Sequence, residues 1–318
     1  MNQVNLITTC TNGKHGMNGN SLNLNGFSSG KISPELLIQS WCDAIQVSLL
    51  DFETIRVENL YKGGHWSTAK TIKKDLLAEL WVLSAGFGLL HSDDYVLPYK
   101  ATFSSGYSES IPYYNQFYIG KGFHKTWWNE ISKRSPFQNE HPTSISSLMK
   151  LKPKEYFIIC GSPDYINAID VDVFNGLQYL ESPRKQLVII TSKPVYSRLS
   201  SYQLKSDARI SQLLKCNMIM LNICLAKYFL NEFIKGSYED FGLLLDKLKI
   251  KFALLPKNKS REINKVTEEE VNKYINSILK ENSKMSATQA LRMFRSSGYS
   301  YEEKKFRNLF YEILNGND

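Results

Sequence analysis

The stretch EYFIICGSPDY, residues 155–165, indicates how the chain folds. Its continuous apolar run lies between Pro153 and Gly161, which is typical of a strand buried on both faces of a sheet. The residues that follow suit a turn from a strand into a helix. Comparable apolar runs, which we also interpret as strands, cover residues 4–8, 80–85 and 187–190.

Segments with apolar residues at helical spacing separate these strands. The clearest examples are residues 35–50, 68–78, 144–151 and 218–233. Strands that alternate with helices predict an α/β fold, with a mostly parallel central sheet and helices on its faces. We assign this fold, and the catalytic role, to residues 1–255.

The last part of the chain has a different character. Residues 256–265 are charged and poor in apolar side chains, as in a linker. Three helices are predicted beyond it, over residues 266–279, 286–296 and 301–314. Ser300 and Glu303 have the spacing of a capping box at the start of the last helix. We therefore expect residues 256–318 to form a small, basic helical module that resembles a helix-turn-helix.

The charge favours a polyanionic partner. The formal net charge is +8 and the sequence pI is about 9.0, values that suit nucleic acid or an anionic membrane surface. No apolar run approaches the length of a membrane span, so the favoured partner is nucleic acid, and above all double-stranded DNA. A basic enzyme without a polyanionic partner remains the alternative.

The cysteines and histidines indicate a reducing compartment and no metal. The five cysteines form no CxxC pair, and no signal-peptide pattern opens the chain. We therefore expect a cytoplasmic protein. Because the histidines show no metal-ligand spacing, we also expect neither a metal nor a cofactor.

Two loops that follow predicted strands contain candidate ligand-binding residues. In parallel α/β sheets, ligands bind beyond the carboxyl ends of the strands. The loop CTNGKHG after the first strand supplies Cys10, Asn12 and Lys14, with backbone amides that suit a phosphate or a base edge. The turn after the 155–160 strand supplies Gly161, Ser162 and Tyr165. The alternative in both places is an ordinary turn, with Asn-Gly for positive φ and Ser162 as a helix cap.

The string LSAGFGLLHSDDYVLPYKATF, residues 83–103, is the third candidate region. A buried strand ends in two glycines, and Asp93 and Asp94 follow. We expect both carboxylates at the carboxyl edge, where they would activate water or stabilise a developing cation. The alternative is a helix N-cap with a solvated neighbour. The same string supplies three substrate-binding candidates, Ser84, Tyr99 and Thr102.

Cationic and aromatic side chains suit contact with nucleic acid. The phosphate-contacting candidates are Lys193, Arg198, Arg292, Arg295, Lys304, Lys305 and Arg307. The alternative is a solvated face for Lys193 and Arg198, and a surface-charged helical cap on the main domain for the others. Tyr107, Tyr113 and Tyr114 have Ser, Gly and Pro neighbours, so we expect them to be exposed and able to stack on bases. We expect Trp127 and Trp128 in the core.

The third region also carries a resemblance. Its pattern SAxFGL…PYxATF, residues 84–103, is similar to that of a bacterial family found beside phage-defence and DNA-modification genes. The likeness extends to the tryptophan pair, to the Gly161–Tyr165 turn and to the 291–307 tail. Peroxide-stress DNA-binding proteins share part of the pattern, and their acidic residue falls on the position of Asp94.

The order of elements also resembles, more loosely, the uracil-DNA-glycosylase fold, although the GQDPY and HPS strings of that superfamily are missing. This resemblance implies an antiphage DNA glycosylase that flips out and excises a modified base, such as a hypermodified or glucosylated one. It makes Asn12 the residue that positions water, and places Gly161 and Ser162 against the DNA.

The chemistry assigns the remaining roles. Cleavage of the C1′–N bond passes through an oxocarbenium-like state, which Asp93 or Asp94 would stabilise. Lys14 or Ser84 would meet the departing base or a phosphate. Two alternatives stay open: a non-catalytic DNA-binding stress or defence protein, and a tRNA base-exchanging transglycosylase.

Overall fold

The computed structural model describes residues 3–17, 22–27, 33–111, 122–134, 137, 140–256, 264–282 and 285–316. The chain divides into two compact units, Met1–Pro256 and Lys257–Asp318, one residue beyond the predicted boundary. Each unit has its own hydrophobic core.

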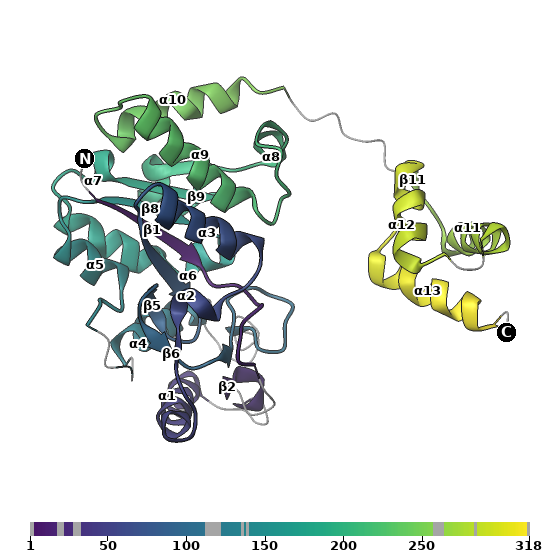
Figure 1. The fold of residues 1–318 in the computed structure, drawn as a ribbon, viewed down its shortest axis with the longest axis horizontal. Helices are drawn as coiled ribbons and strands as arrows, with labels where there is room; N and C mark the ends of the chain where they lie inside the picture. Colours follow the sequence, from purple (N-terminus) through teal and green to yellow (C-terminus); the bar gives the residue numbers. More distant parts are fainter. Residues whose placement is uncertain are drawn as a thin grey trace. The chain divides into compact units, whose positions relative to one another are not determined.

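A six-stranded sheet forms the centre of the first unit, in the order β10-β9-β8-β1-β4-β5 (Figure 1). Its strands are β1 (Val4–Thr9), β4 (Glu79–Ser84), β5 (Gly88–His91), β8 (Tyr156–Cys160), β9 (Leu187–Thr191) and β10 (Gln203–Lys205). All neighbouring strands are parallel except β4 and β5. The four predicted strands and the mostly parallel sheet are confirmed.

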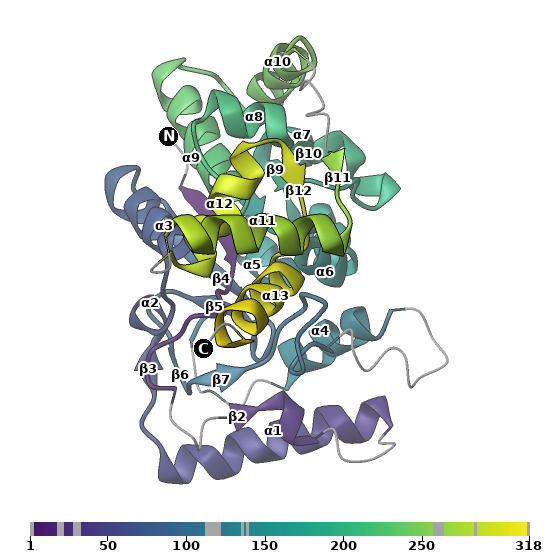
Figure 2. The same ribbon diagram turned by 90° about the vertical axis from the view of Figure 1, so that its right-hand side faces the viewer.

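Helices cover both faces of this sheet, which explains the continuous apolar runs. One face carries α3 (Gly64–Asp75), α9 (Leu221–Lys235) and α10 (Phe241–Ala253) (Figures 1 and 2). The other face carries α4 (Phe123–Lys133), α5 (Ile145–Leu151) and α6 (Pro163–Gly176). Trp127 and Trp128 of α4 are buried, as expected.

The remaining helices and several two-residue strands complete the first unit. The helices are α1 (Pro34–Asp51), α2 (Val57–Leu60), α7 (Pro183–Gln186) and α8 (Ala208–Leu213). The two-residue strands are β2 (Leu22–Asn23), β3 (Ile55–Arg56), β6 (Tyr95–Val96) and β7 (Tyr99–Lys100). Among the described residues of both units, no helix is long and apolar enough to cross a bilayer.

The strand order contains a topological switch point beside β1. The chain passes from β1 to β4 on one side of it and later to β8 on the other side. The loops that leave β1 and β8 therefore separate at the carboxyl edge of the sheet, the place where α/β proteins usually bind ligands.

A buried polar contact holds the amino-terminal half of β1 between its two neighbours. Asn5 is fully buried and accepts a hydrogen bond from Trp81 Nε1 at 3.0 Å. Its own Nδ2 donates to Glu155 at 2.8 Å. Because a slip by one residue would turn Asn5 to the opposite face of the sheet, these contacts specify the register of β1.

The antiparallel strand β5 corrects one expectation. A turn at residues 85–87 reverses the chain after β4, and Gly88 has a φ of +81° that favours glycine. β5 then runs back until His91 lies opposite Trp81, near the amino end of β4. Asp93 and Asp94 are therefore at the amino edge of the sheet, and their predicted position at the carboxyl edge is wrong.

The second unit consists of α11 (Glu268–Glu281), α12 (Ala287–Ser296) and α13 (Glu303–Gly316). Their apolar faces form its core, including Val271, Ile275, Phe294, Phe306 and Phe310. The capping box predicted for the last helix is wrong. That helix begins at Glu303, whereas Ser300 belongs to β12 (Tyr299–Ser300), which pairs with β11 (Asn264–Lys265). Capping boxes instead begin α11 and α12.

Candidate functional site

Most of the predicted substrate-binding side chains meet at the carboxyl edge, beside the switch point. They come from the loop after β1, the end of β4, the segment around β7 and the first turn of α6. Tyr61, which follows α2, lies among them. We call this group the carboxyl-edge cluster: Cys10, Lys14, Tyr61, Ser84, Tyr99, Thr102 and Tyr165.

One half of the cluster surrounds the hydroxyl of Tyr99. Ser84 Oγ donates a hydrogen bond to Tyr99 Oη at 2.8 Å, and Tyr61 Oη lies 3.1 Å from the same oxygen. Ser84 is held in turn by the backbone amide of Phe87, which donates to Oγ at 3.1 Å. The turn that ends β4 therefore fixes the position of this hydroxyl group.

The other half surrounds the hydroxyl of Tyr165. Cys10 Sγ lies 3.0 Å and Thr102 Oγ1 lies 3.2 Å from Tyr165 Oη. Because Cys10 follows β1 and Tyr165 follows β8, this contact spans the switch point. Three segments that are far apart in the sequence thus share one buried hydrogen-bonding group.

Lys14 extends its amine into the cluster. Its side chain is buried, with 7% of the residue exposed, and Nζ lies 4.4 Å from the centre of the Tyr99 ring and 5.7 Å from that of Tyr61. Among the described residues, no carboxylate lies within ion-pair distance of Lys14 and no atom accepts a hydrogen bond from Nζ. Lysine is rarely buried without such a partner.

Burial controls the protonation of these groups. It raises the pKa of Tyr61, Tyr99 and Tyr165 well above the usual value, so their hydroxyls keep their protons at neutral pH. Burial lowers the pKa of Lys14, an effect that Cys10 and Glu109 partly offset. The cluster therefore combines protonated hydroxyls, which can donate hydrogen bonds, with an amine that loses its proton more easily than an exposed lysine.

Three further predicted residues are at the same edge but outside the cluster. Asn12 is exposed on the loop after β1. Gly161 does not face a ligand site, because a Cβ at this position would lie 2.6 Å from Thr9 Cγ2 of the neighbouring strand. Ser162 occupies the N-cap position of α6, but its buried Oγ makes no hydrogen bond among the described residues.

A separate hollow of about 200 Å³ lies between α6 and the segment after β9. The predicted Lys193 lines it, together with Thr191 and Asp170. Thr191 Oγ1 and Asp170 Oδ1 are buried without hydrogen-bond partners among the described residues. The other oxygen of Asp170 pairs with Lys125 Nζ at 2.6 Å. Thr191 belongs to the same predicted segment as Lys193, directly after the fourth strand, whereas Asp170 was not predicted from the sequence.

The remaining predicted cations fall into two groups. Some are already engaged: the guanidinium of Arg198 stacks on Phe174, while Arg295, Lys305 and Arg307 pair with the glutamates of their own unit. Arg292 and Lys304 are exposed and have no ion-pair partner among the described residues. Of the stacking candidates, Tyr107 is exposed, and Tyr113 and Tyr114 lie outside the described residues.

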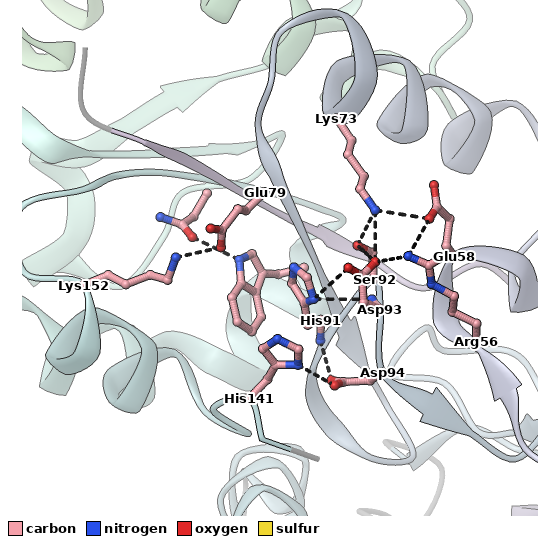
Figure 3. A network of polar contacts seen from close by, with 12 residues as sticks. Arg56, Glu58, Lys73, Glu79, His91, Ser92, Asp93, Asp94, His141 and Lys152 are labelled. Atoms are coloured by element: carbon pink, nitrogen blue, oxygen red, sulfur yellow. Dashed lines mark hydrogen bonds and ion pairs between the residues drawn. The ribbon is translucent and has the colours of Figure 1, made fainter.

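Asp93 belongs to an ion-pair network at the amino edge (Figure 3). Its Oδ1 accepts hydrogen bonds from Arg56 at 2.6 Å and from Lys73 at 3.1 Å. Partial burial raises the pKa of Asp93, but the hydrogen bonds from these two cations outweigh it and lower the pKa to about 2. The side chain is 44% exposed and fully engaged, as in a surface ion pair.

Asp94 is buried and joins two segments of the same edge. Its Oδ2 accepts the backbone N–H of His91 at 2.7 Å, and its Oδ1 lies 2.6 Å from His141 Nδ1. Figure 3 shows His141 directed at this carboxylate. The rings of His91 and His141 are 4.2 Å apart, and both line a groove of about 520 Å³. Neither histidine was predicted from the sequence to be a site residue.

The structure therefore separates Asn12 from Asp93 and Asp94, which lie at opposite edges of the sheet. A shared site for the three predicted catalytic residues is excluded by the reversal of β5. Within the described residues, no group of histidine, cysteine and carboxylate side chains is arranged to hold a metal ion.

Comparisons with known proteins give no family. No protein-family model matches the chain, and no curated protein or solved structure matches it. A proposed function therefore rests on the geometry of the two edges of the sheet.

Proposed function

We propose that the chain is a DNA N-glycosylase that removes a modified base, with its active site at the carboxyl-edge cluster. The proposal includes a uracil-DNA-glycosylase-like arrangement of the first unit and a role in antiphage defence, with hypermodified phage bases as substrates. Asp93 and Asp94 have no part in it.

One observation carries the proposal: loops from three separate strands bring a buried amine and several hydroxyls together at the switch point. Fold stability alone does not account for this arrangement, because burying polar groups is costly. The cost is especially high for a buried lysine such as Lys14, which has no ion-pair partner among the described residues. Perturbed, desolvated groups that converge at the ligand-binding edge of an α/β sheet are typical of functional sites.

The chemistry of the cluster suits an extruded base. Such a base is recognised by hydrogen bonds to its polar edge and by stacking on aromatic rings. Tyr99 and Tyr165 supply both hydroxyls and rings, while Thr102 and Ser84 supply further hydrogen-bonding groups. A duplex with one base turned out would place that base at the cluster.

Charge supports DNA as the partner. The net charge of +8 favours binding to a phosphate backbone. The exposed cations Arg292 and Lys304 of the second unit are free of ion pairs within the described residues, so they are available for phosphates. Lys193 is similarly exposed beside the hollow next to α6.

The test is base release. The full chain is incubated with unmodified DNA and with hypermodified phage DNA, and released bases are identified by mass spectrometry while abasic sites are counted. We expect release from modified DNA only. Tyr99→Phe and Tyr165→Phe, which remove a single hydroxyl each, should lower the rate about 10-fold, the effect of one lost hydrogen bond of about 1.4 kcal/mol.

Tyr95→Phe is the matched control, since it removes a hydroxyl from an exposed tyrosine outside the cluster. It should release bases at the wild-type rate. Salt-dependent DNA binding without release from any modified DNA would instead identify a non-catalytic DNA-binding protein. Equal rates for Tyr99→Phe, Tyr165→Phe and wild type would remove the cluster from the active site.

A further inference from the structure

Lys14 is the most unusual group of the carboxyl-edge cluster. The residues beside it in the loop, Asn12, Gly13 and His15, are exposed, yet the side chain of Lys14 is buried. Backbone hydrogen bonds hold this loop against the chain around Tyr61: His15 N–H donates to Leu60 O at 2.7 Å, and Lys62 N–H to Gly13 O at 2.9 Å. The loop thus places an amine just beneath the surface of the ligand-binding edge.

The surroundings of this amine favour its neutral form. It lies among aromatic rings, no carboxylate of the described residues is within ion-pair distance of it, and Glu109 offsets the effect of burial only in part. Desolvated lysines of this kind are the ones that act as nucleophiles and form imines with carbonyl carbons. The neighbouring hydroxyls of Tyr61 and Tyr99 stay protonated, so they can serve as hydrogen-bond donors during the reaction.

We propose that Lys14 is the nucleophile of the reaction and that the protein therefore cleaves the DNA strand as well as removing the base. This inference rests on the proposed function, because it assigns the group that attacks the sugar. It replaces the carboxylate that the oxocarbenium chemistry first suggested with an amine at the correct edge of the sheet.

The reaction of Lys14 with the sugar passes through an imine at C1′. The Nζ lone pair forms a bond to C1′, the C1′–N bond breaks, and its electron pair leaves with the base, which takes up the proton that Nζ loses. The nitrogen lone pair then opens the sugar ring, giving a protonated imine at C1′, and O4′ takes a proton from water. The hydroxide left by that water takes a proton from C2′, and the electron pair of the broken C2′–H bond forms the C2′–C3′ double bond, expels the 3′-phosphate and leaves an unsaturated imine. Water hydrolyses this imine to the unsaturated aldehyde, which regenerates the Lys14 amine.

An abasic site tests the imine without knowledge of the base. A labelled duplex with one abasic site is incubated with the full chain and sodium cyanoborohydride, a hydride donor that reduces the imine to a stable amine. We expect a covalent protein–DNA adduct, and peptide mass spectrometry should place it on Lys14. Lys14→Met should reduce the adduct at least 10-fold.

Lys62→Met is the matched control, because Lys62 is exposed and lies on the segment that pairs with the Lys14 loop. It should form the adduct as the wild type does. An adduct mapped to other lysines, an unchanged yield in Lys14→Met, or no adduct at all would overturn the proposal. Mapping the wild-type adduct gives the answer even where Lys14→Met fails to fold.

The two proposals fail in different ways. Base release from modified DNA without any trapped adduct would leave the glycosylase in place and overturn the role of Lys14. A Lys14 adduct with abasic DNA, but no base release from any modified DNA, would support the nucleophile and overturn the glycosylase.

Discussion

Asp94→Ala distinguishes a structural aspartate from a catalytic one. The substitution removes the acceptor for the His91 amide and the partner of His141 Nδ1, at 2.7 and 2.6 Å. Hydrogen bonds to a carboxylate contribute about 1.5–3 kcal/mol each. Removing the carboxylate also leaves the buried donors without an acceptor, which destabilises the fold further. We take the lower end, about 3 kcal/mol for both, because the edge of the sheet relaxes in part.

This loss has a measurable size. In a unit of this length, 1 kcal/mol corresponds to about 2–4 °C in Tm, so Asp94→Ala should unfold roughly 6–12 °C below the wild type. Asp94→Asn keeps the shape and one acceptor oxygen, so its loss should be about half as large. Calorimetry or thermal circular dichroism measures both values. Base release by the folded variants should stay within about twofold of wild type, because Asp94 lies at the edge opposite the cluster.

Two results would refute this reasoning. If Asp94→Asn kept the wild-type Tm but released bases about 100-fold more slowly, Asp94 would act in catalysis after all. If Asp94→Ala lost no stability, the contacts with His91 and His141 would not hold the amino edge together.

Three other predictions concern charge. Asp93→Asn should cost under about 1 kcal/mol at neutral pH because its ion pairs are exposed. The pKa of Asp93 is 3.8 in the unfolded chain and about 2 in the folded one, so the ionised carboxyl stabilises the fold. The difference in stability between wild type and variant should therefore vanish as the pH falls from 3.8 through about 2. Urea unfolding at several pH values measures this difference. Lys14→Met should raise the free energy of unfolding at neutral pH. Because burial lowers the pKa of Lys14 in the folded protein, this gain in stability should shrink as the pH approaches 10.5, where the amine of the unfolded chain also loses its proton. A difference in stability that does not change with pH would contradict the burial argument. Arg292→Ala and Lys304→Ala should each reduce the salt dependence of DNA binding by about one phosphate contact. Arg307→Ala should change the salt dependence of DNA binding less, because Arg307 already pairs with Glu303 at 3.1 Å. If all three variants changed the salt dependence equally, Arg292 and Lys304 would not be the phosphate contacts.

The strands of the sheet were predictable because helices cover both faces. Most positions of such a strand are apolar on both faces, as in the run Phe157–Cys160, and the run ends where the chain leaves the sheet. The same principle placed the ligand loops, since the residues directly after parallel strands share one edge. That is why Cys10 and Tyr165 were anticipated at a common site and lie 3.0 Å apart.

The edge strand was not predictable in this way. β5 has four residues, GLLH, and follows the glycine-containing turn at once. An apolar run of this length fits equally a strand that reverses and a segment that leaves the sheet, because periodicity is the same in both. The difference decides the edge at which Asp93 and Asp94 lie.

Tyr61 was missed for another reason. It follows a one-turn helix, not a strand, so its place at the carboxyl edge depends on long-range pairing with the Lys14 loop. His141 reaches Asp94 through a comparable tertiary contact. Neither contact has a local pattern, and each arises only when the whole unit is assembled.

The central position of β1 has a consequence for how the chain folds during synthesis. Within the sheet β1 is synthesised before every other strand, yet its hydrogen-bonding partners begin at Glu79 and Tyr156. The backbone groups of the segment VNLITT therefore remain without their strand partners until much of the first unit has been translated. Non-local pairing of this kind slows folding, and an unpaired apolar strand is prone to aggregation until its partners have been made.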